Sequence, residues 1–160
     1  MDDAQDTLGP SARIARDLIR FDTTNWGGGR SNGEREAAEY LEAALSGLGL
    51  STTVHESAER RTSVFTRVSG ADPTKPALVV HGHTDVVPAD PGNWSVDPFA
   101  GIVRDGMLWG RGAVDMKDMD AMMLQSLTDI LTSGRQPARD LVIAYFADEE
   151  FGAQVLICSE

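Results

Sequence analysis

The chain has almost no cysteine: Cys158 is the only one, so no disulfide can form within the chain. Structural disulfides belong mainly to oxidising compartments, and their exclusion here predicts a cytoplasmic protein. The first six residues, MDDAQD, agree with that prediction, because they are acidic where a secretory signal peptide is basic and then apolar. We interpret Cys158 as a small buried hydrophobic residue rather than a nucleophile.

Basic residues are also scarce, with 14 lysines and arginines against 25 acidic residues and a formal net charge of −11. Such a charge repels phosphate backbones and anionic lipids, so we expect neither nucleic acid nor a membrane as a partner. The chain lacks an apolar run long enough to cross a bilayer, and it lacks internal repeats. Its 160 residues, 41% of them hydrophobic, suit one globular domain or part of a larger one.

Three consecutive glycines, Gly27-Gly28-Gly29, have the look of a phosphate-binding loop. The lysine of a Walker motif does not follow it, and no predicted strand precedes it. We therefore interpret residues 22–29 as a flexible connection.

The hydrophobic pattern alternates between helical and extended periods. Ser31 and Glu34 have the spacing of a capping box, which predicts that a helix begins there. The alternation predicts a three-layer α/β fold with a mostly parallel central sheet and helices on both faces. The expected helices cover 11–21, a segment from about 34 to 48, and a segment from Asp115 to Gly134; the expected strands cover 51–55, 62–69, 77–80 and 140–147, with a hairpin at 102–109.

Three groups of histidine or acidic residues stand where predicted elements end. His81, His83 and Asp85 follow a buried strand, Asp115 precedes a helix, and the Asp-Glu-Glu sequence at 148–150 follows another buried strand. Carboxyl ends of parallel strands meet at one edge of a sheet, so these groups are expected to converge. Several carboxylates in one place repel each other unless a cation neutralises them. A mixture of imidazole and carboxylate suits zinc, with Mn²⁺ or Co²⁺ as alternatives.

Each group also has a simpler interpretation. A His-x-His at a strand end is often structural, an Asp before a helix is often a cap, and two adjacent glutamates in a loop are usually solvated. Their joint occurrence at one kind of edge favours a two-metal hydrolase. The alternatives left open are a non-catalytic remnant of such an enzyme, which folds or binds a partner without turnover, and a structural α/β domain without metal.

Four sequence words resemble the M20 metallopeptidase family, which includes acetylornithine deacetylase, succinyl-diaminopimelate desuccinylase, carboxypeptidase G2-like enzymes and aminoacylase. The words are HGHTDVVP at 81–88, NWSVDPF at 93–99, LWGRGAVDMK at 108–117 and DEE at 148–150. Their order and spacing also match, from the first predicted helix to the last word. The resemblance implies a zinc-dependent hydrolase that cleaves the amide bond of an N-acyl amino acid or a short peptide.

The resemblance also implies a role for each matching residue. His83 would bind one zinc ion, Glu150 would bind a second, and Asp115 would bridge the two. Asp85 would orient the imidazole of His83 and so serve catalysis, and Glu149 would be the general base. His81 matches no ligand position, and the peptide bond after Asp115 is expected to be cis.

The chain departs from the family pattern after residue 150. Family members have a further carboxylate ligand and a histidine ligand downstream, and an inserted lid domain that makes dimer contacts. We therefore expect residues 1–160 to be the N-terminal portion of a metallohydrolase catalytic domain, with the lid domain and the C-terminal part absent. On that basis the chain alone is expected to be weakly active or inactive, and a homodimer is expected only with the lid domain. Asp118 and Met119 also stand where many members have glycine.

Overall fold

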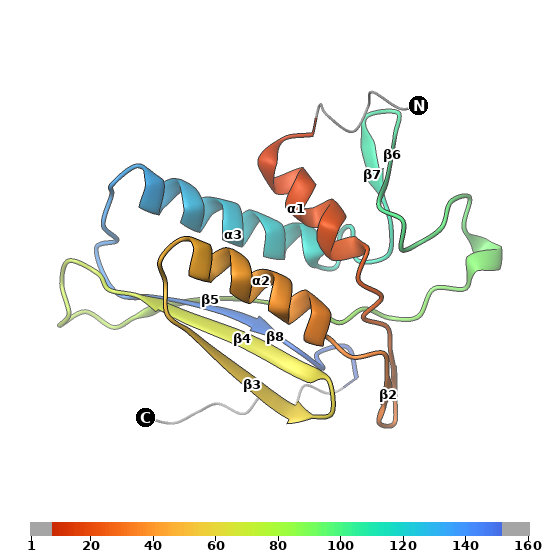
Figure 1. Ribbon diagram of the computed structural model, residues 1–160, viewed down its shortest axis with the longest axis horizontal. Coiled ribbons are helices and arrows are strands. Elements are labelled where there is room, and N and C mark those ends of the chain that lie inside the picture. Colours follow the sequence, from red (N-terminus) through yellow and green to blue (C-terminus); the bar gives the residue numbers. More distant parts are fainter. Residues whose placement is uncertain (1–7, 152–160) are drawn as a thin grey trace.

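The computed structural model describes residues 8–151, so the interpretation of Cys158 lies outside the described residues. Three helices lie over one face of a four-stranded sheet (Figure 1). The helices are α1 (Pro10–Ile19), α2 (Arg35–Gly47) and α3 (Lys117–Thr132), and the strands of the sheet, in spatial order, are β3 (Thr52–Ala58), β4 (Arg61–Val68), β8 (Leu141–Phe146) and β5 (Leu78–His83). Two small hairpins, β1 (Asn25–Gly27) with β2 (Arg30–Ser31) and β6 (Ile102–Arg104) with β7 (Met107–Trp109), and the short 3₁₀ helix η2 (Pro91–Asn93) complete the described part.

The α/β class predicted from the sequence is confirmed, with a sheet that is mixed. Strands β3 and β4 are joined by a tight turn at Glu59 and Arg60, which permits only antiparallel pairing. β4 also pairs with β8 in antiparallel fashion, whereas β5 and β8, which are connected through α3, run parallel. The finer expectation of a mostly parallel sheet is therefore met only by β5 and β8. Among the described residues, the helices cover one face of this sheet and not both (Figure 1).

The core lies between the helices and this covered face of the sheet. On α2, Ala37, Leu41 and Leu45 recur at helical spacing and are buried, which is the apolar stripe that the sequence predicts. On β4 and β8, alternate residues such as Val64 and Tyr145 enter the same cluster, as the period of two in a strand requires. No described helix is long and apolar enough to cross a membrane.

The register of the sheet gathers several chain segments at one edge. Because β5 and β8 are parallel, and His83 pairs with Phe146, both strands end at this edge. β4 runs the opposite way, so it begins where they end: Val64 pairs with Tyr145. Continuing that register places Arg61 opposite Asp148. The turn after β8 is thus flanked by residues from both neighbouring strands.

Two local predictions near the N-terminus are wrong. The segment predicted as a flexible connection, 22–29, contains strand β1, which pairs with β2 directly after it, and the main chain of Asn25 donates a hydrogen bond to the carbonyl of Val86 at 2.9 Å. The capping box does not form, since no side chain caps α2 and the Ser31 hydroxyl accepts from the amide of Gly33. The Glu34 side chain instead turns inward to Arg61, which provides a stronger partner than an exposed amide.

Candidate metal centre

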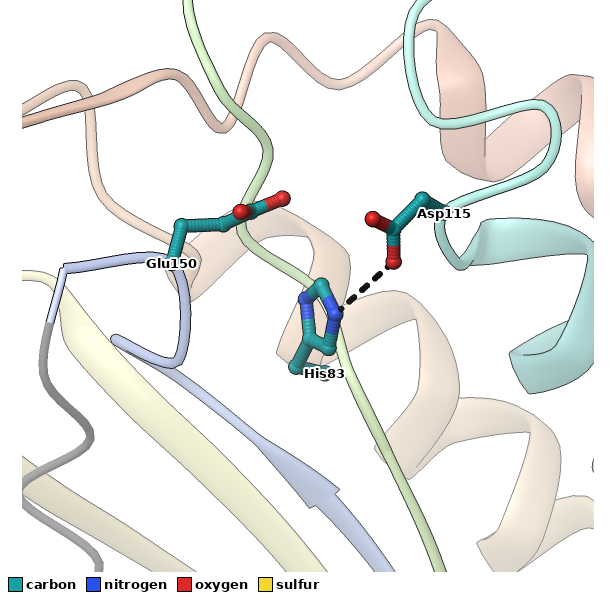
Figure 2. A group of neighbouring side chains, drawn as sticks. All are labelled: His83, Asp115 and Glu150. Carbon is teal, nitrogen blue, oxygen red and sulfur yellow. Dashed lines mark ion pairs between the residues drawn. The ribbon is translucent and has the colours of Figure 1, made fainter.

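Three predicted ligands come together at the carboxyl edge of the sheet. One ligand atom from each of His83, Asp115 and Glu150 lies within 4.8 Å of the other two (Figure 2). His83 ends β5, Asp115 lies in the loop before α3, and Glu150 lies in the turn after β8. One imidazole and two carboxylates, with further coordination positions open, form a donor set suited to Zn²⁺. The arrangement fits the metal that the resemblance implies.

The imidazole of His83 is held through one ring nitrogen. Its Nδ1 lies 3.1 Å from the carbonyl oxygen of Asp85 and 3.4 Å from the Oδ1 atom of the same residue. Since a carbonyl oxygen only accepts hydrogen bonds, the proton sits on Nδ1 in this contact. Nε2 faces Asp115 Oδ1 at 3.3 Å and Glu149 Oε2 at 3.6 Å. The ring therefore presents Nε2 to the carboxylates, as a metal-binding histidine with an orienting carboxylate does.

Asp85 is completely buried, yet it remains a carboxylate. Burial alone would raise its pKa, but the contact from His83 and hydrogen bonds from Asn25 and the amides of Glu149 and Glu150 lower the pKa to about 2. The two amides donate to its oxygens at 3.0 and 3.1 Å. Asp85 thus fixes both the imidazole and the main chain of the turn that carries the two glutamates.

Glu149 and Asp115 are the exposed members of the group. Their side chains are 53% and 75% exposed, so both can contact a small molecule from solvent. Glu150 is more buried, and burial together with the negative charge of Asp115 raises its pKa despite the opposing charge of His83. Metal binding would relieve this repulsion among the carboxylates.

His81 lies away from this cluster, as expected. Its ring packs edge-on against Phe146 at a centroid distance of 5.7 Å, and its side chain is exposed. Strand β5 ends at His83, so Asp85 lies two residues beyond the end of the strand. The expected cis peptide bond between Asp115 and Met116 is present.

Lys117 anchors the loop that presents Asp115. This lysine is fully buried, and its Nζ donates to the carbonyls of Leu18 at 3.0 Å and Phe21 at 2.8 Å, at the end of α1. Burial lowers its pKa to about 8, although nearby acidic residues, Asp120 first among them, oppose the shift. The beginning of α3 is thereby fastened to the end of α1.

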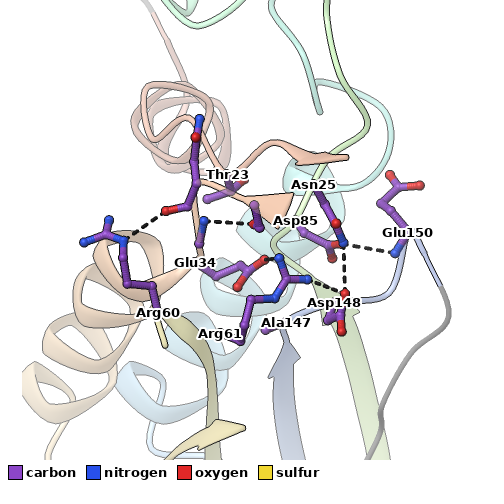
Figure 3. A network of polar contacts seen from close by, with 12 residues as sticks. Thr23, Asn25, Glu34, Arg60, Arg61, Asp85, Ala147, Asp148 and Glu150 are labelled. Carbon is purple, nitrogen blue, oxygen red and sulfur yellow. Dashed lines mark hydrogen bonds and ion pairs between the residues drawn. The ribbon is translucent and has the colours of Figure 1, made fainter. Parts of the chain in front are cut away.

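A second polar cluster, which the sequence did not suggest, supports the first (Figure 3). Arg61 pairs with Glu34 at 3.1 Å through one nitrogen and with Asp148 through another. Asn25 connects Asp148 to Asp85. Burial raises the pKa of Glu34, and the guanidinium of Arg61 opposes that rise. Only the register of β4 against β8 brings Arg61 to Asp148, so no local sequence pattern could have revealed it.

The pKa of His83 makes metal binding depend on pH. Burial would lower this pKa, but the hydrogen bond and the charge of Asp85 raise it to about 9. A metal binds only the ring whose Nε2 is free of a proton. We therefore expect the affinity for Co²⁺ to rise about tenfold per pH unit between pH 6 and 8, below that pKa. Titration followed by visible absorption checks this, and an affinity that is unchanged from pH 6 to 8 would contradict it.

The fold and the cluster together define a class: an α/β domain with a candidate metal site outside the carboxyl ends of two adjacent parallel strands. Residues 79–158 match the family described as Peptidase family M20/M25/M40. The chain belongs to this family of peptidases and amide hydrolases.

Relatives of known name agree with that assignment. The succinyl-diaminopimelate desuccinylase of Gluconacetobacter diazotrophicus is 38% identical over 144 residues, which cover 88% of this chain and 35% of the relative. The N-fatty-acyl-amino acid synthase/hydrolase PM20D1 of Xenopus tropicalis is 35% identical over 127 residues, which cover 77% of this chain and 25% of the relative. The chain thus spans a quarter to about a third of the length of these proteins.

The fold has a close counterpart among solved structures. The M20 family metallo-carboxypeptidase Sso-CP2 from Sulfolobus solfataricus superimposes with a TM-score of 0.74 at 20% identity, over 89% of this chain and 32% of that one. Similarity at this level of identity shows a shared fold.

Proposed function

We propose that this chain is the N-terminal part of the catalytic domain of a zinc-dependent hydrolase that cleaves an amide bond. The observation that carries the proposal is the convergence of His83, Asp115 and Glu150 within 4.8 Å, beside an exposed carboxylate. Membership of a family of peptidases supports it. The lid domain and the rest of the catalytic domain would lie outside these 160 residues, and a dimer would form only through the lid.

In this proposal the residues of this chain would supply some of the ligands of two zinc ions. His83 would bind one ion through Nε2, Glu150 would bind the other, and Asp115 would bridge them. The remaining ligands would come from the part of the catalytic domain that lies outside these 160 residues. Bound zinc supplies a Lewis acid, which polarises the scissile carbonyl group and makes a water molecule acidic. Co²⁺ or Mn²⁺ would suit the same ligands.

Glu149 would act as the general base. Its Oε2 atom lies 3.6 Å from Nε2 of His83, the nitrogen assigned to the metal, and its side chain is exposed. From there its carboxylate would take a proton from the attacking water and deliver it to the leaving amine nitrogen. Asp85 would serve this step by keeping the imidazole and the two glutamate amides in place.

The substrate would be a small N-acyl amino acid or a short peptide. The desuccinylase and the N-fatty-acyl-amino acid hydrolase both act, by their names, on acylated amino acids. The net charge of −11 argues against nucleic acid as a partner. A cytoplasmic location stays a prediction based on the single cysteine.

The test combines metal binding with turnover. The purified chain, with Zn²⁺ added, is assayed against N-succinyl and N-acetyl amino acids and dipeptides, beside Glu149→Gln. We expect the chain to bind zinc weakly, because ligands are missing, and to show little or no turnover. Any turnover should vanish in Glu149→Gln, while zinc binding should change by less than about threefold, since this residue is not assigned as a ligand.

Two results would contradict the proposal. One is turnover that survives Glu149→Gln, which would remove the proposed base. The other is zinc binding that is unaffected by Asp115→Asn and Glu150→Gln, which would place the metal elsewhere.

A further inference from the structure

The side chain of Asn25 occupies a central position between two carboxylates. Its amide nitrogen donates one hydrogen bond to Asp85 Oδ2 at 2.9 Å and another to Asp148 Oδ1 at 3.0 Å (Figure 3). Its oxygen accepts from the amide of Gly27 at 3.0 Å. Only 2% of Asn25 is exposed, so every polar atom of the side chain is used in a buried setting.

The two carboxylates that Asn25 joins hold the same turn at different points. Asp148 begins the turn and has a left-handed backbone, with φ of 65°. Asp85 receives the main-chain amides of Glu149 and Glu150, the next two residues. Two carboxylates held this close would repel each other; Asn25 places a neutral group with two donors between them, and Arg61 pairs with Asp148 from the other side of the cluster.

Asn25 is itself fixed to the segment that contains Asp85. Its main-chain amide donates to the carbonyl of Val86, and Thr24 forms a parallel β-bridge with the same residue. The hydroxyl of Thr23 donates to the carbonyl of Thr84 at 2.6 Å. Residues 23–25 are therefore held by hydrogen bonds against Thr84 and Val86, the residues on either side of Asp85.

We infer that Asn25 is a positioning residue for the metal centre: it locks the turn at 148–150 against Asp85, so that the carboxylate of Glu150 stands within reach of His83 and Asp115. The inference rests on the proposed function and adds a residue to it. Asn25 touches neither metal nor substrate in this role. It acts through the turn, and its effect should be visible only while Glu150 is a ligand.

The side-chain chemistry at position 25 is specific. Aspartate would bring a third negative charge and no donor. Leucine has a similar shape and no hydrogen-bonding group. Serine keeps an oxygen that can accept from the amide of Gly27, as an ST-turn does, but it is too short to donate to both carboxylates.

The experiment is a double-substitution cycle on the full chain, read by Co²⁺ binding. Wild type, Asn25→Leu, Glu150→Gln and the double variant are titrated with Co²⁺, with affinity and d–d absorption recorded. We expect Asn25→Leu to weaken binding by about 10–100-fold, the range for groups that orient ligands, and to alter the d–d band. In the Glu150→Gln background the same substitution should change affinity by less than about twofold.

Asn32 supplies a matched control. It comes directly after the same hairpin and is exposed, so Asn32→Leu should leave Co²⁺ affinity unchanged. Asn25→Ser repeats the comparison with the turn at Gly27 retained, in case Asn25→Leu does not fold.

The outcomes are separable. If wild type binds no Co²⁺, the proposed function fails and the inference fails with it. If wild type binds Co²⁺ and both Asn25 variants bind equally well, only the inference fails. If they lose affinity to the same extent with and without Glu150, Asn25 has a general structural role and the inference is overturned.

Discussion

Replacing His83 with alanine is expected to weaken Zn²⁺ binding by at least about 100-fold, more than the loss of an orienting neighbour would cause. The imidazole is the only nitrogen donor of the cluster, and its Nε2 already faces Asp115 at 3.3 Å. The remaining carboxylates are harder ligands that hold zinc less well. Isothermal titration of wild type and His83→Ala with Zn²⁺, at pH 7.5, measures the change.

His81 provides the control for this substitution. It is the same residue type, two positions earlier on the same strand, but its ring packs on Phe146. His81→Ala should leave zinc affinity within about twofold. Equal losses from the two alanine substitutions would show that the metal does not depend on the cluster at the sheet edge, and would contradict the assignment of His83.

Replacing Arg61 with methionine is expected to lower the free energy of unfolding at pH 9, where the carboxyl of Glu34 is ionised, by about 3–5 kcal/mol, the usual result of removing one partner of a buried ion pair. Glu34 is fully buried and would lose its cation. Burial already raises the pKa of Glu34, so the folded state binds a proton more readily than the unfolded state does. The contribution of Glu34 to stability therefore falls as the pH rises from its ordinary pKa of 4.5 to its pKa of about 8 in the folded state, and the loss in Arg61→Met should be larger at pH 9 than at pH 6.

Chemical denaturation at pH 6 and pH 9 measures both effects. Arg60→Met is the matched control, because Arg60 pairs with Glu36 on the surface and should cost less than about 1 kcal/mol. Adding Glu34→Gln to Arg61→Met should recover much of the lost free energy of unfolding. The remaining loss should then be the same at pH 6 and at pH 9. If Arg60→Met and Arg61→Met cost the same, the buried pair is not what stabilises this edge.

The sequence predicted those parts of the molecule that local periodicity or sequence words determine. Helical spacing along α2 predicted its buried face correctly, because that pattern depends on only a few neighbouring residues. Along β4 the predicted alternation holds from Val64 to Val68, whereas the residues from Arg61 to Val64 are all buried. The ends of β5 and β8 predicted where His83 and Glu150 converge, because parallel strands end at a common edge. The α/β class emerged from the same alternation.

The features that the sequence could not predict depend on partners that are distant along the chain. The antiparallel pairing of β4 with β8 places Arg61 opposite Asp148, and no periodicity within either strand indicates which neighbour it takes. Glu34 had the spacing of a capping residue, but its carboxylate pairs instead with the buried guanidinium of Arg61. Asn25 lies in a stretch rich in glycine and threonine, where the composition indicates a loop and says nothing of a site.

The parallel pairing of β5 with β8 has a consequence for how the protein folds. Between these strands the chain must first pass through β6, β7 and α3, so their contact closes a long loop. Contacts of this kind form slowly, and His83 and Glu150 meet only when this one is made. An ion that needs both residues cannot serve as a nucleus for folding. It should leave the refolding rate almost unchanged and act by slowing unfolding.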